Sequence, residues 1–112
     1  MASDEKFVQF VCDQMAAAGE ITTRRMFGEY AVYCDEKVVA LVCDNRLFVK
    51  PTQPGRELLR VVVEAPPYTG AKPHFLIEDD LDDSILLSKL ISVTASQMQK
   101  PKPKAPKKKK TA

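Results

Sequence analysis

Residues 21–50 read ITTRRMFGEYAVYCDEKVVALVCDNRLFVK, and this stretch decides the fold. Its apolar and β-branched residues fall into runs that predict strands over residues 21–26, 30–34, 38–43 and 46–50. Short polar segments separate the later runs and are typical of hairpin turns. Phe27-Gly28-Glu29 joins the first two runs, and Gly28 permits a tight or bulged turn there. Consecutive strands with such short links indicate an antiparallel meander.

The third run, VVALVC at residues 38–43, is apolar at every position. A strand with one face in water alternates apolar and polar residues, so we expect this strand to be central and covered on both faces. A chain of 112 residues has few elements that could supply a second cover. We therefore expect the protein to self-associate, with another subunit covering one face of the sheet.

Helical patterns flank the meander. Residues 4–18 carry apolar side chains on one face at a spacing of 3.6 residues, with Ser3 as the candidate N-cap. The other expected elements are a short helix over residues 55–62, an irregular loop over residues 64–73, a fifth strand over residues 74–77, and a last helix from Asp82 or Asp83 to about Met98. The order α-β-β-β-β-α-β-α predicts a two-layer α+β fold, with helices packed on an antiparallel sheet.

Length and composition indicate one small domain that we expect in the cytosol. The chain has 112 residues, of which 45% are hydrophobic. No apolar run approaches the roughly 18 residues of a spanning helix, and the polar, acidic first residues are unlike a signal peptide. The odd cysteine count, at Cys12, Cys34 and Cys43, argues against a disulfide framework or a zinc site. Cys34 and Cys43 should lie at opposite ends of neighbouring strands, about 15 Å apart at ~3.3 Å per residue.

The net charge of +2 conceals an asymmetry along the chain. Residues 1–99 carry ten basic and fifteen acidic groups, a balance of −5, and we expect them to form the folded domain. Residues 100–112 carry seven lysines and no acid, and their Lys, Pro and Ala composition predicts a disordered tail. The candidate polyanion-binding residues of this tail are Lys100, Lys102, Lys104, Lys107, Lys108, Lys109 and Lys110.

The segment Arg25-Met26-Phe27-Gly28-Glu29-Tyr30-Ala31-Val32-Tyr33, with Leu47-Phe48-Val49-Lys50 further on, resembles the N-terminal domain of the TfoX family, also called TfoX/Sxy. The resemblance covers about residues 5–98. Two positions depart from the family pattern, since Glu29 and Ala31 stand where the family favours glycine. The resemblance implies a small cytosolic bacterial protein without enzymatic activity and with a regulatory or adaptor role. We expect it to stand alone, without the C-terminal domain of the longer members that regulate natural competence.

No recognisable catalytic set or cofactor motif emerges from the sequence. His74 is the single histidine, and nothing in its spacing pairs it with a cysteine as nucleophile and base. The acidic run over residues 78–83 does not match an EF-hand, and we expect it to solvate a loop, with one carboxylate capping the last helix. An enzyme would need a pocket that gathers Arg25, Tyr30, Tyr68 or His74. We expect no enzyme, no cofactor and no metal.

Arg25, Phe27, Tyr30 and Lys50 are the candidate contacts for a partner or ligand, since basic and aromatic groups together engage anionic ligands. Neighbouring strand residues point to opposite faces, so Arg24 cannot share a patch with Arg25. The alternative is that the aromatic residues pack inside while the arginines pair with acids. The leading hypothesis is a regulatory or adaptor-type protein-interaction module, expected as a homodimer. The alternative is a nucleic-acid-associated accessory protein that uses its lysine tail as a weak, non-specific polyanion anchor.

Overall fold

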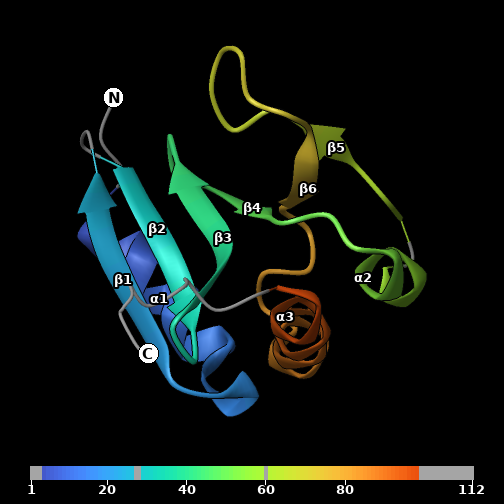
Figure 1. Cartoon of the computed structure of the whole chain (residues 1–112). Coiled ribbons are helices and arrows are strands. Elements are labelled where there is room, and N and C mark those ends of the chain that lie inside the picture. Colours follow the sequence, from blue (N-terminus) through green and yellow to red (C-terminus); the bar gives the residue numbers. More distant parts are fainter. Residues whose placement is uncertain (1–3, 27–28, 60, 99–112) are drawn as a thin grey trace, which may run out of the picture.

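The computed structural model describes residues 4–26, 29–59 and 61–98. The elements, in chain order, are α1 (Glu5–Gln14), the 3₁₀ helix η1 (Ala16–Ala18), β1 (Ile21–Met26), β2 (Glu29–Cys34), β3 (Lys37–Cys43), β4 (Arg46–Val49), α2 (Gln53–Leu58), β5 (Glu64–Ala65), β6 (His74–Ile77) and α3 (Ser84–Gln97). The strands form one antiparallel sheet of order β1-β2-β3-β4-β6-β5 (Figure 1). The predicted α+β class and the meander β1 to β4 are therefore confirmed.

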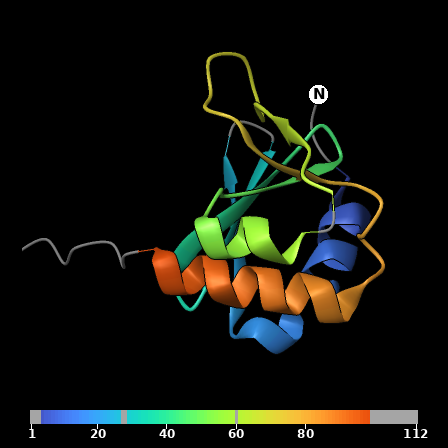
Figure 2. The same ribbon diagram turned by 90° about the vertical axis from the view of Figure 1, so that its right-hand side faces the viewer.

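All the helices lie on one side of the sheet. In Figure 2, α2 and α3 lie in front of the strands, and α1 and η1 close the same layer. Every second side chain of a strand points toward these helices, because successive side chains of a strand point to opposite faces of the sheet. The buried cluster between the two layers contains Val11 of α1 and Met15 at its C-terminal end. It also contains Leu87, Leu90 and Ile91 of α3. This helix-covered face is the core of the domain.

Two tight hairpins fix the register of the meander. Asp35 and Glu36 join β2 to β3, and Asp44 and Asn45 join β3 to β4, all with positive φ angles between 50° and 71°. Two central residues of positive φ define a type I′ turn, whose twist suits antiparallel strands. An irregularity at Val32 in the pairing of β2 with β3 adds one residue to β3. Tyr30 then lies opposite Val42, and Cys34 opposite Lys37, which places Cys34 and Cys43 at opposite ends of β3 as expected.

Several predicted boundaries are wrong. The first helix ends at Gln14 and is capped by Asp4, whose carboxylate accepts the Lys6 N–H at 2.9 Å. The predicted cap, Ser3, lies outside the described residues. The short helix begins at Gln53, two residues earlier than predicted, because the Thr52 hydroxyl caps it, and it ends at Leu58 rather than at residue 62. The loop predicted over residues 64–73 contains the short strand β5, which pairs with β6.

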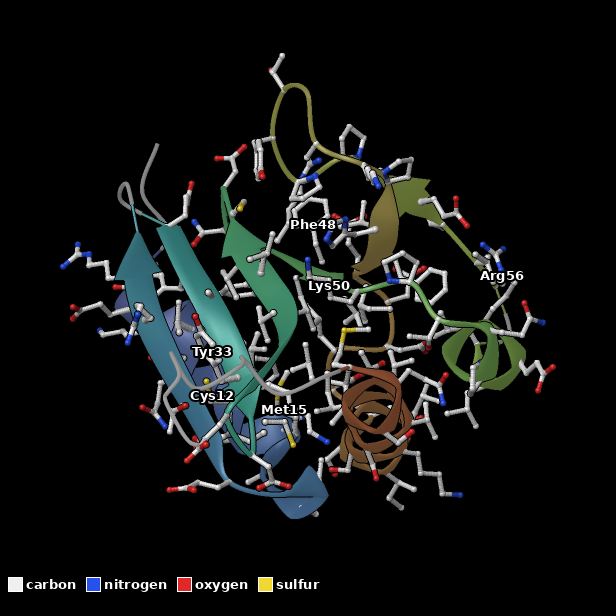
Figure 3. All side chains as sticks on the ribbon, in the orientation of Figure 1. Cys12, Met15, Tyr33, Phe48, Lys50 and Arg56 are labelled. Carbon is white, nitrogen blue, oxygen red and sulfur yellow. The ribbon has the colours of Figure 1, made fainter. Side chains whose placement is uncertain are left out.

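The second half of the sheet is joined to the helices through α2. Arg56 of α2 forms an ion pair with Glu64 of β5, and its guanidinium carbon lies 5.4 Å from the centroid of the Phe75 ring (Figure 3). Gly55 in the first turn of α2 sits close to Phe75 and to Leu90 of α3. These contacts place α2 beside α3 in the helical layer, against Phe75 of β6 (Figure 2).

Candidate functional site

The face of the sheet away from the helices carries the candidate site. We call it the helix-free face, and its central part consists of Glu29, Ala31 and Tyr33 of β2, Val38, Leu41 and Cys43 of β3, and Arg46 and Phe48 of β4. Register places Ala31, Leu41 and Phe48 in one row across the three strands. Ala31 and Phe48 are buried, yet neither belongs to the cluster that packs against the helices. This face therefore has a small apolar layer of its own.

The expectation that β3 is covered on both faces is met in part. β3 is central, between β2 and β4, and its helix side is fully buried at Val42. On the helix-free face, Val38 and Leu41 are only half-buried, as is Tyr33 beside them. Within the described residues, the cover on this side is the segment between β5 and β6, which lies beside the tip of β3 (Figure 1).

A pocket of about 480 Å³ lies on this face at the Cys43 end of β3. The side chains or backbone that line it belong to Glu29, Tyr30, Leu41, Cys43, Asp44, Pro67 and Tyr68. The strand residues form its floor, and the segment between β5 and β6 supplies one wall. In that wall Pro67 is buried, whereas Tyr68 is 61% exposed. The volume lies in the range of roughly 300–1,000 Å³ that is typical of ligand pockets.

Two carboxylates, Glu29 and Asp44, line this pocket. The Glu29 carboxylate accepts the backbone N–H of Asp44 at 3.1 Å, which holds it at the hairpin beside the Asp44 side chain. Burial raises the pKa of the Cys43 thiol, and the charges of Glu29 and then Asp44 raise it further. Since the thiolate is the nucleophilic form, Cys43 is held in its unreactive form at neutral pH. The pocket can thus take an apolar group or a cation on an apolar stem.

The structure brings two of the four predicted contact residues together. Arg25 and Tyr30 lie opposite each other on β1 and β2, and the Arg25 guanidinium carbon is 5.7 Å from the Tyr30 ring centroid. Phe27 lies outside the described residues. Lys50 follows β4 and donates its backbone N–H to Val39, near the other end of β3 (Figure 3). The described part of the set is therefore one Arg–Tyr pair and one distant lysine. Arg24 pairs with Ala31 in register, so it faces away from Arg25 as predicted.

His74 is a buried residue of β6, with 6% of its surface exposed. Its Nδ1 lies 2.8 Å from the carbonyl oxygen of Lys72, and its Nε2 has no hydrogen-bond partner in the described part of the chain. The pocket on the helix-free face gathers Tyr30 and Tyr68 but includes neither Arg25 nor His74. Of the residues named for an enzyme's pocket, this one therefore gathers only the two tyrosines.

The acidic run precedes α3, and Asp83 caps that helix. The Asp83 carboxylate accepts the Leu86 N–H at 3.0 Å, which confirms that one acid of the run serves as a cap. Within residues 4–26, 29–59 and 61–98, no group of three or more histidine, cysteine, aspartate or glutamate side chains could hold a metal ion. The lysine tail lies outside the described residues, so its predicted disorder and polyanion contacts stay predictions.

Sequence reasoning missed Leu41, Cys43 and Asp44 as parts of a pocket. Alternation along β3 predicts which side chains share a face, but not which face the helices leave open. The wall depends on Pro67 and Tyr68, more than twenty residues further along the chain. The one signal available in the sequence was the segment Pro66-Pro67-Tyr68, an aromatic residue after two prolines in the predicted irregular loop.

None of the described helices is long and apolar enough to cross a membrane.

Comparison with known proteins settles the family. The model of the TfoX N-terminal domain matches residues 13–98. An uncharacterised 12.7 kDa protein encoded in the trpE 5′ region of Spirochaeta aurantia is 41% identical over 104 residues, which cover 93% of this chain and 90% of that protein. The chain therefore belongs to the TfoX N-terminal domain family.

Proposed function

We propose that this protein is a non-enzymatic regulatory or adaptor-type module of the bacterial cytoplasm that binds proteins through its helix-free face. The observation that carries the proposal is the apolar layer on that face, where Val38, Leu41 and Tyr33 are half-buried and no described helix packs on them. Membership of the TfoX N-terminal domain family supports a regulatory role. Burial raises the pKa of all three cysteine thiols, which keeps them in the protonated, weakly nucleophilic form and favours binding over catalysis.

A second copy of the chain is the partner that we propose for this face. Two sheets pack face to face about 10 Å apart when their inner faces interdigitate. Leu41 stands in register between the buried Ala31 and Phe48, and Tyr33 lies two residues along β2 from Ala31 on the same face. Pairing of two helix-free faces would complete the cover of β3 that its continuous apolar sequence calls for.

Light scattering over a wide concentration range tests the proposal. The wild type should form dimers whose fraction rises with concentration, and Leu41→Asp should abolish them because it buries a charge in the interface. The matched control is Ile85→Asp, which places the same charge at a 70% exposed apolar residue of α3 on the helix side. A strict monomer at high protein concentration, at both low and high salt, refutes self-association, and equal effects of the two substitutions refute this face as the interface.

A second candidate function is nucleic-acid association through the lysine tail. Its support is the charge distribution, with seven lysines and no acid in residues 100–112 against a balance of −5 in the rest. Fluorescent DNA and RNA should bind the full chain with a log–log salt slope toward about −6 if all seven lysines contact duplex phosphates. Replacing Lys107 to Lys110 by glutamine should flatten that slope by about four times 0.9. An unchanged slope places any binding elsewhere, and no binding at low salt rejects this function.

A further inference from the structure

The pocket on the helix-free face has the chemistry of a site for a lysine side chain. Lysine carries an ammonium group on an apolar four-carbon stem, and the stem packs on apolar surface while the charge stays near its rim. Leu41 and Cys43 supply the apolar floor, and Glu29 and Asp44 supply the negative charge. Tyr68 stands at the wall with most of its ring exposed, where a cation can lie on its face.

Charge within the pocket favours a basic occupant. Its described lining contains two carboxylates and no basic side chain. Both carboxylates act on the pocket floor, since each raises the pKa of the Cys43 thiol. Arg46 is exposed and lies opposite Cys43 in register, but it does not line the pocket. The same chain carries a run of four lysines at residues 107–110.

The tail begins close enough to reach this pocket. The Lys37 ammonium donates to the carbonyl oxygen of Ala95 at 3.2 Å, so the last turn of α3 lies at the Lys37 end of β3. The pocket lies at the Cys43 end, and the strand between them spans about 20 Å at ~3.3 Å per residue. A proline-rich chain in the polyproline II conformation extends about 3.1 Å per residue, so nine residues beyond Met98 span about 28 Å.

We infer that the lysine run at residues 107–110 docks in the pocket of the helix-free face of the same molecule, with an ammonium group between Glu29 and Asp44 and beside Tyr68. The inference rests on the proposed function, since the docked tail lies on the proposed interaction face. Docking makes the tail a competitor of the protein partner. It also makes pocket occupancy and polyanion binding mutually exclusive, because the same lysines serve both.

Zero-length carbodiimide cross-linking of the full chain tests this inference. The reagent joins a lysine amine to a carboxylate only when the two are in contact, and mass spectrometry of the digest identifies the pair. We expect cross-links from residues 107–110 to Glu29 or Asp44 at low salt, and their loss at 1 M salt, where the Debye length is about 3 Å. Cross-links mainly to the acidic residues 78–83, or spread evenly over exposed acids, overturn the inference.

Two variants separate a built pocket from mere proximity. Tyr68→Ala keeps both carboxylates and removes the aromatic wall, so the yield at Glu29 and Asp44 should fall by about two- to fivefold, the effect of an exposed cation–π contact. The control, Tyr33→Ala, removes an aromatic side chain of the same face that does not line this pocket. Equal cross-link yields in wild type and Tyr68→Ala would refute docking of the tail in this pocket. Circular dichroism confirms that each variant is folded.

A mixture of ¹⁴N- and ¹⁵N-labelled chains distinguishes docking within one molecule from docking between two. Cross-linked peptides should carry a single label, and mixed-label pairs overturn docking within one molecule. Failure of the proposed function has a different signature. If light scattering finds no dimer while the cross-links persist, the tail docks on a face that does not self-associate. If dimers respond to Leu41→Asp but the cross-links are absent, the face is an interface and the tail does not occupy it.

Discussion

Leu41 and Leu47 offer a direct test of how the two faces of the sheet differ. They lie on the neighbouring strands β3 and β4 but point to opposite faces, because Leu41 pairs with Phe48 and Leu47 pairs with Val42. Leu47 is 0% exposed and belongs to the cluster packed against the helices. Leu41 is half-buried on the helix-free face. Replacing each by alanine removes the same atoms from two different environments.

The expected losses of unfolding free energy differ by a factor of about two at the middle of their ranges. A buried leucine replaced by alanine costs about 2–5 kcal/mol, since the removed groups leave a cavity as well as lose their burial. Leu47→Ala should fall within this range. Leu41→Ala should cost about 1–2 kcal/mol in the monomer, because its side chain still contacts water and little cavity forms. The larger loss is a sizeable share of the 5–15 kcal/mol that is typical of a small domain.

Urea unfolding followed by circular dichroism at low and at high protein concentration measures both losses. At low concentration the ratio of the two losses reports the monomer. At high concentration the loss caused by Leu41→Ala should grow if a second copy covers Leu41, because association stabilises the folded state by mass action. The loss at Leu47 should be the same at both concentrations. Equal losses at low concentration would refute the assignment of the two faces.

Three further outcomes follow from single positions. Gly55→Ala should lower the melting temperature, because a Cβ there would lie 2.8 Å from the Thr52 hydroxyl that caps α2. Glu36→Gly should raise the unfolding free energy by about 0.5–1 kcal/mol in a urea titration, since Glu36 has a φ of 71° that glycine adopts without strain. Glu29→Gln should speed alkylation of Cys43 at pH 8, because losing a negative charge lowers the raised pKa of the thiol. Mass spectrometry measures the alkylation rate, with Asp79→Asn as the control that removes an acidic charge elsewhere. An alkylation rate that Glu29→Gln leaves unchanged contradicts the prediction for Cys43.

The sequence predicts the sheet better than it predicts the site. The strands β1 to β4 are recognisable because apolar β-branched residues and short polar turns recur, and local preference agrees with the final structure there. The sequence predicts the start of α2 two residues late, because Pro54 favours a helix that begins just after it, whereas the Thr52 hydroxyl caps the helix. The Asp35-Glu36 turn has positive φ at both residues without a glycine to signal it. The pocket could not be predicted, because Tyr68 reaches β3 only through the tertiary fold.

The two occupants proposed for the helix-free face depend on different forces, and salt separates them. Docking of the lysine tail is a contact between exposed charges, which salt screens over a Debye length of about 10 Å at 0.1 M and about 3 Å at 1 M. Pairing of two faces through Leu41 and Tyr33 buries apolar surface, which salt does not screen. Raising the salt concentration should therefore release the tail and increase the dimer fraction in sedimentation. Tyr68→Ala should give more dimer than wild type at low salt and the same amount at high salt. A dimer fraction that falls with salt in both proteins would mean that charges, not the apolar layer, hold the two copies together.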